Sequence, residues 1–282
     1  MSQSQNSPVH PQRHLLLDGI DLAAVRALEI GALTAPSLVR PGVDVLYADH
    51  ADTAALRAKY ADHPDRDPAR FVEVDIVWPG GPLRPLLGAA PPFDLVFASH
   101  VIEHVPDMIG WLAALAEVVR PGGRLCLAIP DQRFTFDVLR RPTGLPELLD
   151  AHLRGNRRPM PAQVFDHHAN VVMLDREAAW RGAVDPAALE HYATPAQALQ
   201  MCQRAMAGEY IDVHCWVFTP HSLMTLLGGL ATLGLLAWRC AAFHPTEPLA
   251  LEMLLVLERA ADGADPAGTA AGFAASAARL PC

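Results

Sequence analysis

Residues 28–36 read LEIGALTAP, a short apolar run that reaches a glycine at Gly31. This pattern is typical of a buried β-strand that turns into a loop, because glycine lets the backbone pass close to a ligand where a side chain would obstruct it. Glu29 adds a negative charge beside the turn, which would repel a phosphate and attract a positively charged group. A dinucleotide-binding turn carries two further glycines, and their positions hold Leu33 and Pro36 here. The turn therefore favours a cofactor that has no phosphates.

Outward from this turn, short apolar runs alternate with helical stretches from residue 27 to residue 130. Such alternation is typical of βα units and a parallel sheet. The expected strands are 27–30, 43–47, 71–74, 93–98 and 124–129. A helix that begins near Pro220, with Thr219 as its N-cap, precedes two further expected strands, 237–243 and 252–257. The link between those two strands is too short for a crossover, so they should pair antiparallel.

These patterns predict an α/β fold: a Rossmann-like, doubly wound, mostly parallel sheet with a C-terminal antiparallel hairpin and a largely helical insertion after the fifth strand. The insertion should rise over the carboxyl ends of the strands, where ligands bind in such sheets. The Ala/Gly-rich tail is expected to be disordered. The predicted parts are an N-terminal segment (1–26), a cofactor-binding core (27–130), a substrate-binding insertion or lid (131–217), a helix and hairpin completing the core (218–259) and the tail (260–282).

Acidic residues lie at the ends of the first three expected strands. Asp49 lies twenty residues after Glu29, the distance at which an acid commonly reaches the ribose hydroxyls of an adenosine. Asp75 follows the third strand, where its carboxylate could accept a hydrogen bond from an adenine amino group. The three acids would face one crevice, because the carboxyl ends of parallel strands share an edge of the sheet.

The fourth strand and its continuation, FDLVFASHVIEHVPD at 93–107, complete a recognisable set together with RPGGRL at 120–125. These motifs resemble the small-molecule type of class I S-adenosylmethionine-dependent methyltransferases, over residues 27–130 and the terminal hairpin. The chain departs from the family's E-x-G-x-G-x-G turn in its second and third glycines. The resemblance implies S-adenosylmethionine as the cofactor and places Ser99 and His100 at the reaction centre. The expected cofactor-binding residues are Glu29, Gly31, Ala32, Asp49, His50, Asp75, Ile76 and Ser99.

Three histidines are the expected catalytic residues, because a hydroxyl acceptor needs a base. His100 directly follows the fourth strand, while His167 and His214 come from the insertion. Metal-ligand residue types occur in the insertion, but their spacing matches no metal signature, so no metal is predicted. The Glu103-His104 pair is common in the resembled family whatever its substrate, so we expect it to have a structural or cofactor-positioning role.

Composition and charge limit the classes of binding partner and the cellular location that we expect. The formal net charge is −9 and no block of Lys or Arg occurs, which disfavours nucleic acid as a partner. The five cysteines form no Cys-x-x-Cys pair, which fits a reducing cytoplasm. The most apolar segment, 223–238, is too short to span a membrane, and no signal peptide is evident.

The expected activity is methyl transfer from S-adenosylmethionine to an oxygen or nitrogen of a small-molecule acceptor, such as a sugar or another metabolite. An alternative is a cofactor-binding protein of the same fold that does not methylate or that uses the cofactor for another reaction. A nicotinamide oxidoreductase is disfavoured by Leu33 and Pro36 in the turn.

Overall fold

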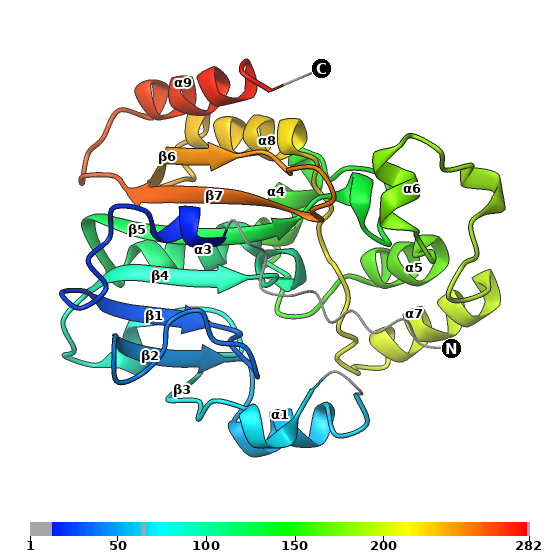
Figure 1. Ribbon diagram of the computed structural model, residues 1–282, viewed down its shortest axis with the longest axis horizontal. Coiled ribbons are helices and arrows are strands. Elements are labelled where there is room, and N and C mark those ends of the chain that lie inside the picture. The colour runs from blue at the N-terminus through cyan, green and yellow to red at the C-terminus, as the bar shows by residue number, and fades with distance from the viewer. Residues whose placement is uncertain (1–12, 64–65, 281–282) are drawn as a thin grey trace.

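The computed structural model describes residues 13–63 and 66–280. Seven strands form one sheet in the order β3-β2-β1-β4-β5-β7-β6 (Figure 1). The first five strands pair in parallel, and β7 is antiparallel to both β5 and β6. The mostly parallel sheet with a C-terminal antiparallel hairpin is thus confirmed. The strands are β1 (Arg26–Ile30), β2 (Asp44–Asp49), β3 (Ile76–Val77), β4 (Phe93–Ser99), β5 (Val119–Pro130), β6 (Trp238–His244) and β7 (Glu252–Arg259).

The expected third strand at 71–74 is wrong, since only Ile76 and Val77 pair with β2. The amides of Val72 and Val74 form their hydrogen bonds outside the sheet. The Val72 amide donates to the Leu33 carbonyl at 2.9 Å. The Val74 amide donates to the Thr53 hydroxyl at 2.8 Å. These residues are extended, but their partners are a loop and a helix side chain rather than a neighbouring strand.

Helices α3, α8 and α9 pack on one face of the sheet, and the 3-10 helix η1 packs on the other. Most α-helices begin at an Asp or Thr whose side chain accepts a hydrogen bond from the first turn, frequently with proline in that turn. The Thr219 cap and Pro220 start are confirmed. The α-helices are α1 (Thr53–Lys59), α2 (Arg84–Leu87), α3 (Met108–Ala116), α4 (Leu145–Leu153), α5 (Pro161–Asn170), α6 (Arg176–Trp180), α7 (Pro195–Met206), α8 (Pro220–Thr232) and α9 (Pro266–Ala277). Five short 3-10 helices are η1 (Arg13–Leu17), η2 (Pro68–Arg70), η3 (Ile102–His104), η4 (Gln132–Phe134) and η5 (Pro186–Ala188).

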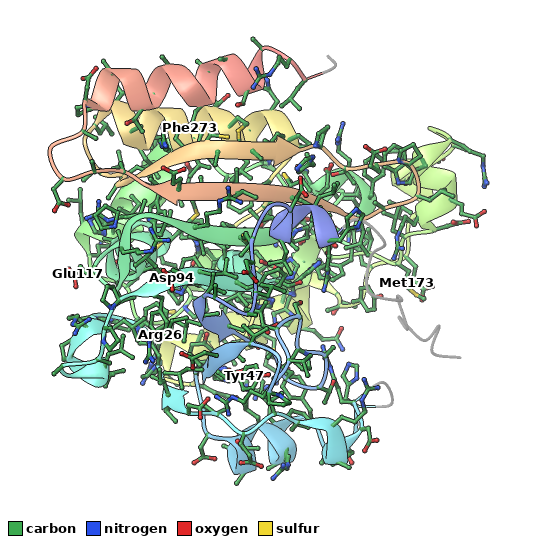
Figure 2. The ribbon with its side chains drawn as sticks, turned by 60° about the vertical axis from the view of Figure 1, so that its left-hand side comes forward. Arg26, Tyr47, Asp94, Glu117, Met173 and Phe273 are labelled. Carbon is green, nitrogen blue, oxygen red and sulfur yellow. The ribbon has the colours of Figure 1, made fainter. Side chains whose placement is uncertain are left out.

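The expectation of a disordered tail is wrong for most of its length. Asp265 caps α9, and Phe273 is fully buried between α9 and α8 (Figure 2). Alanine is the strongest helix former, and an apolar surface on α8 receives this helix. Composition alone therefore misread an Ala-rich helix as low-complexity chain.

The sheet separates two apolar cores and leaves its carboxyl edge open to the insertion. The larger core lies between the sheet and helices that include α3, α8 and α9, and the smaller one packs beneath η1. At the opposite edge, the Arg26 amide donates to the Asp94 carboxylate at 2.8 Å, joining β1 to β4 (Figure 2). Helices α5, α6 and α7 lie beyond the strand ends toward which the arrows of β1, β4 and β5 point (Figure 1).

No helix in the described part of the chain is both long and apolar enough to cross a membrane. The segment 223–238, which the sequence analysis had singled out, is divided between α8, a turn and the start of β6. Of the expected N-terminal part, residues 1–12 lie outside the described residues.

Candidate functional site

A cavity opens at the carboxyl ends of β1, β2 and β4. Its wall comes from the loops after these strands, from the segment after β3, and from the stretch that joins α7 to α8. It lies where an open α/β sheet binds ligands. The lining residues are Ile30, Gly31, Leu33, Asp49, His50, Tyr60, Trp78, Pro79, Gly80, His100, Val101, His104, Val105, Pro106, Trp111, Tyr210 and Asp212.

Gly31 lines this cavity and cannot be replaced without strain. Its φ is +73°, and a Cβ built there would lie 2.8 Å from a methyl carbon of Val101. Both the backbone conformation and the close approach require glycine. The turn that the sequence singled out is thus a place where bare backbone meets the cavity.

Asp49 also lines the cavity, at the end of β2. Its carboxylate accepts hydrogen bonds from the backbone amide of His50 at 2.7 Å and from the His50 ring at 2.6 Å. A carboxylate offers about four acceptor positions, so others stay open for ligand hydroxyls. Asp49 is only 7% exposed, which makes it a well-ordered acceptor.

Glu29 lies behind the turn rather than in the cavity. Its carboxylate accepts hydrogen bonds from the amides of Ser37 at 2.7 Å and Leu38 at 2.8 Å. Burial raises the pKa of Glu29 to about 7, although both amide bonds act in the opposite direction. The structure therefore places Glu29 as an anchor for the loop after β1, out of reach of a bound ligand.

Asp75 is not at a strand end, contrary to the sequence expectation. It precedes β3, accepts a hydrogen bond from the Tyr47 amide at 2.7 Å and pairs with Arg40. Its carboxylate is thus engaged outside the cavity. Ala32, Ile76 and Ser99 do not line the cavity either, so Gly31, Asp49 and His50 are the expected cofactor residues that do.

The segment after β3 brings Trp78 to the cavity, a residue that sequence reasoning missed. Its ring stacks on Trp111 with centroids 6.2 Å apart and planes 13° apart. Its Nε1 donates to the Gly81 carbonyl at 2.9 Å, which fixes the ring. An aromatic residue just past a strand end was the available signal. The pair supplies an apolar wall suited to a flat ligand ring.

His100 projects into the cavity from the end of β4. Its φ of 53° is a left-handed conformation, which costs a non-glycine residue about 1–3 kcal/mol, and such residues cluster at functional sites. Its Nε2 lies 2.7 Å from Oε2 of Glu252. Glu252 also accepts two hydrogen bonds from Arg13, at 2.8 and 2.9 Å. Burial would raise the pKa of Glu252, but the bonds from His100 and Arg13 prevail and lower it to about 2.

This pairing fixes the proton on His100. Because Glu252 is ionised and can only accept, Nε2 of His100 must donate to it. In the neutral ring, Nδ1 is then the nitrogen with the free lone pair. His100 lines the cavity with this lone pair available for a proton, and its Nδ1 lies 3.6 Å from Oε1 of Glu103.

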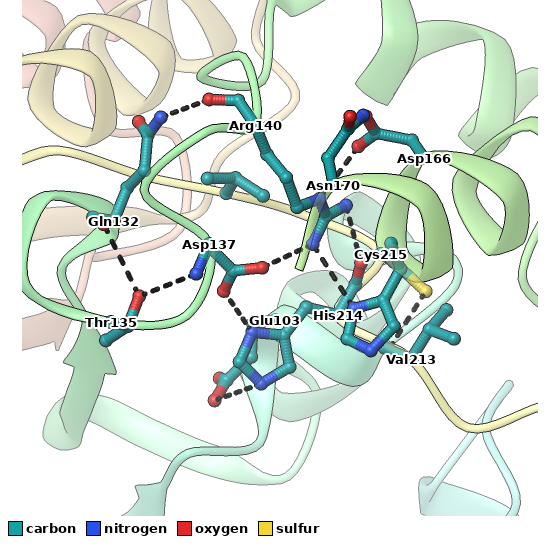
Figure 3. A network of polar contacts seen from close by, with 12 residues as sticks. Glu103, Gln132, Thr135, Asp137, Arg140, Asp166, Asn170, Val213, His214 and Cys215 are labelled. Carbon is teal, nitrogen blue, oxygen red and sulfur yellow. Dashed lines mark hydrogen bonds and ion pairs between the residues drawn. The ribbon is translucent and has the colours of Figure 1, made fainter. Parts of the chain in front are cut away.

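Figure 3 shows a second polar group, which includes Glu103, Asp137, Arg140 and His214. Glu103 on η3 is fully buried, and both of its carboxylate oxygens lack a hydrogen-bond partner. Its backbone carbonyl accepts bonds from the amides of Cys215 at 2.7 Å and Trp216 at 3.2 Å. This attaches the returning segment to η3 and brings His214 beside His104, with ring centroids 4.7 Å apart.

The two insertion histidines expected to be catalytic do not line the cavity. His214 is 7% exposed, and its Nδ1 lies 2.6 Å from Oδ2 of Asp137. His167 lies one ring further away, 5.8 Å from His214 between centroids. Burial and the charge of Arg140 lower the pKa of His167 to about 3, so it is neutral at neutral pH. His100 alone of the three expected catalytic residues reaches the cavity directly.

A family model described as "Methyltransferase domain" matches residues 41–229, most of the chain. No curated protein matches the sequence. Among solved structures, one described as Zn-dependent alcohol dehydrogenases from Rhodobacter sphaeroides is 15% identical, with a TM-score of 0.50, and the match covers 90% of this chain and 91% of that one. At that identity the likeness shows the fold alone.

Two other solved structures have methyltransferase names. An S-adenosylmethionine-dependent methyltransferase from Mesorhizobium loti is 13% identical with a TM-score of 0.41, over 88% of this chain and 96% of that one. The CurJ carbon methyltransferase is 14% identical with a TM-score of 0.41, over 86% of this chain. The match covers only 50% of the CurJ chain. Both scores are too low to bear on chemistry.

Proposed function

The chain belongs to the methyltransferase domain family, and we propose that it transfers the methyl group of S-adenosylmethionine to an oxygen or nitrogen of a small molecule, such as a sugar or another metabolite. S-adenosylmethionine is the cofactor that this family membership and the cavity support together.

The sheet supports this cofactor over a dinucleotide. Dinucleotide-binding sheets run in the order 3-2-1-4-5-6. Here the antiparallel β7 is inserted between β5 and β6. The turn after β1 also lacks two of the glycines that admit a pyrophosphate. A phosphate-free adenosine cofactor meets neither obstacle.

The lining residues supply what such a cofactor needs. Asp49 offers a carboxylate to the ribose hydroxyls, and Trp78 offers an apolar wall to a flat base. The bare backbone at Gly31 admits the cofactor close to the sheet.

Methyl transfer is an in-line displacement at the sulfonium carbon. The acceptor's lone pair forms the new bond to carbon while the carbon–sulfur bond breaks and its electron pair stays on sulfur. Positioning and exclusion of water do most of the catalysis. A hydroxyl acceptor also loses a proton, which Nδ1 of His100 would take.

One observation carries the proposal: His100, oriented by ionised Glu252, shares a cavity with Gly31 and Asp49. A base and a cofactor-binding turn therefore face the same space.

The test incubates the purified protein with S-adenosylmethionine labelled in its methyl group and with pools of small hydroxyl and amine compounds. Label in a low-molecular-weight product, together with S-adenosylhomocysteine, is the expected result. Turnover of the cofactor with no methylated product from any pool would favour the other-reaction alternative and count against the proposal.

A further inference from the structure

Glu103 is a buried carboxylate that has no hydrogen-bond partner among the described residues. Its side chain has no exposed surface, and neither oxygen has a hydrogen-bond partner. The nearest cationic or ring groups with a stated distance are Nδ1 of His100 at 3.6 Å and Nε2 of His214 at 4.0 Å, both beyond hydrogen-bonding range. Burying a carboxylate without a partner is costly, so it calls for a bound cation or a proton.

Two imidazoles beside this carboxylate are each held by a second acid. Nδ1 of His104 lies 2.9 Å from Asp212, and Nδ1 of His214 lies 2.6 Å from Asp137. Asp137 is fixed by Arg140 at 2.7 Å (Figure 3), and Asp212 by Lys59 at 2.7 Å.

Each of these carboxylates already accepts from a cationic side chain, Asp137 from Arg140 and Asp212 from Lys59. A carboxylate paired in this way accepts from the neighbouring ring, so each histidine donates through Nδ1 and keeps Nε2 for another partner.

The three remaining ligand atoms converge. One oxygen of Glu103 and one nitrogen each from His104 and His214 all lie within 4.8 Å of one another. An ion bound at about 2.0–2.2 Å would draw each atom inward by less than about 1 Å. A histidine that donates its second nitrogen to a carboxylate is the usual arrangement around a protein-bound metal.

We propose that Glu103, His104 and His214 form a binding site for a divalent transition-metal ion of the zinc type, with an open position toward the cavity. Two histidines and a glutamate are a donor set of catalytic zinc sites, which leave the fourth position to water or substrate. His104 is the ligand that lines the cavity, so the open position is placed on the cavity side.

This inference rests on the proposed function and narrows its acceptor to a hydroxyl compound. Glu103, His104 and His214 would hold the ion, which would supply the Lewis acidity that lowers the pKa of a bound hydroxyl. The proton passes to His100, the oxygen bonds the methyl carbon, and sulfur keeps the electron pair of the broken bond.

The test uses Co²⁺ as an optical probe and Zn²⁺ in calorimetry and thermal denaturation, on the full chain freed of metal with a chelator. One ion should bind per chain. Glu103→Gln should weaken binding at least about 100-fold, because it removes a ligand charge without changing shape. Asp137→Asn should weaken it about 10–100-fold through the misoriented His214. His221→Ala alters an exposed histidine outside the cavity and should leave binding unchanged.

Folding is monitored in the same samples. Removing a buried unpartnered charge should keep Glu103→Gln at least as heat-stable as the metal-free parent, so its loss of binding would not reflect unfolding. Zn²⁺ should raise the Tm of the parent and leave that of Glu103→Gln unchanged. Equal binding by the parent and Glu103→Gln, or no binding by the parent, would overturn the site.

Separate measurements keep the two proposals apart. S-adenosylhomocysteine binding without Co²⁺ binding would remove the metal site and leave the proposed function standing. Co²⁺ binding without S-adenosylhomocysteine binding would do the reverse. Equal turnover of a hydroxyl acceptor by metal-free and Zn²⁺-loaded protein would refute the assigned role of the ion.

Discussion

Nε2 of His100 lies 2.7 Å from Oε2 of Glu252, a residue 152 positions further along the chain. The first residue follows β4 and the second opens β7, so the antiparallel strand brings the acid to the histidine. The pair gives His100 a defined tautomer and a defined direction, which are the two properties that a general base needs.

Replacing His100 should lower turnover without loss of cofactor. His100→Asn is the appropriate variant, since asparagine tolerates the positive φ of this position. If His100 takes the acceptor's proton, the rate should fall about 10²–10⁴-fold. Affinity for S-adenosylhomocysteine, measured by calorimetry, should change little. An unchanged rate in His100→Asn, beside an unchanged His221→Ala control, would remove His100 from the mechanism.

Asp49→Ala should weaken cofactor binding. The change removes the charged acceptor for the ribose hydroxyls, which is worth roughly 2–3 kcal/mol if two charge-assisted bonds are lost. Asp44→Ala is the matched control, because Asp44 begins the same strand at its far end and pairs with Arg26 on the surface. Calorimetry with S-adenosylhomocysteine should separate the two variants. Equal affinities would mean that Asp49 does not bind the ribose.

The contribution of Glu252 to the free energy of unfolding should be lost in acid. Its pKa is lowered from 4.5 to about 2, so the folded state binds fewer protons than the unfolded state between these values. Its contribution is therefore complete above about pH 4.5 and disappears as the pH falls toward 2. That contribution is on the order of 3 kcal/mol. Urea denaturation at several pH values should show a shallower acid limb in Glu252→Gln, and parallel limbs would contradict the assigned pairing.

The sequence predicted the parts of the site that depend on local pattern. Asp49 ends a strand, and Gly31 and His100 each directly follow one. The apolar runs of these strands are easily recognised, so the position of the three residues at the sheet edge could be inferred. Asp75 was misplaced because β3 pairs over two residues only, and its apolar run does not mark where pairing begins. Glu29 was assigned to the right turn but to the wrong side of it.

Long-range contacts were beyond sequence reasoning. No spacing rule predicts that Glu252 reaches His100, or that the segment after α7 returns His214 to Glu103. Both depend on where a distant strand or loop packs. The Glu103-His104 pair was expected to have a structural or cofactor-positioning role, and it is a candidate metal site only because His214 lies beside it.

The central claim is that the cavity takes an adenosine cofactor without phosphates. Calorimetric titration of the purified protein with S-adenosylhomocysteine and, separately, with NAD tests it most directly. We predict one S-adenosylhomocysteine bound per chain and no measurable NAD binding, because Leu33 and Pro36 replace two pyrophosphate glycines. NAD binding at comparable strength, or no binding of S-adenosylhomocysteine, would contradict the account.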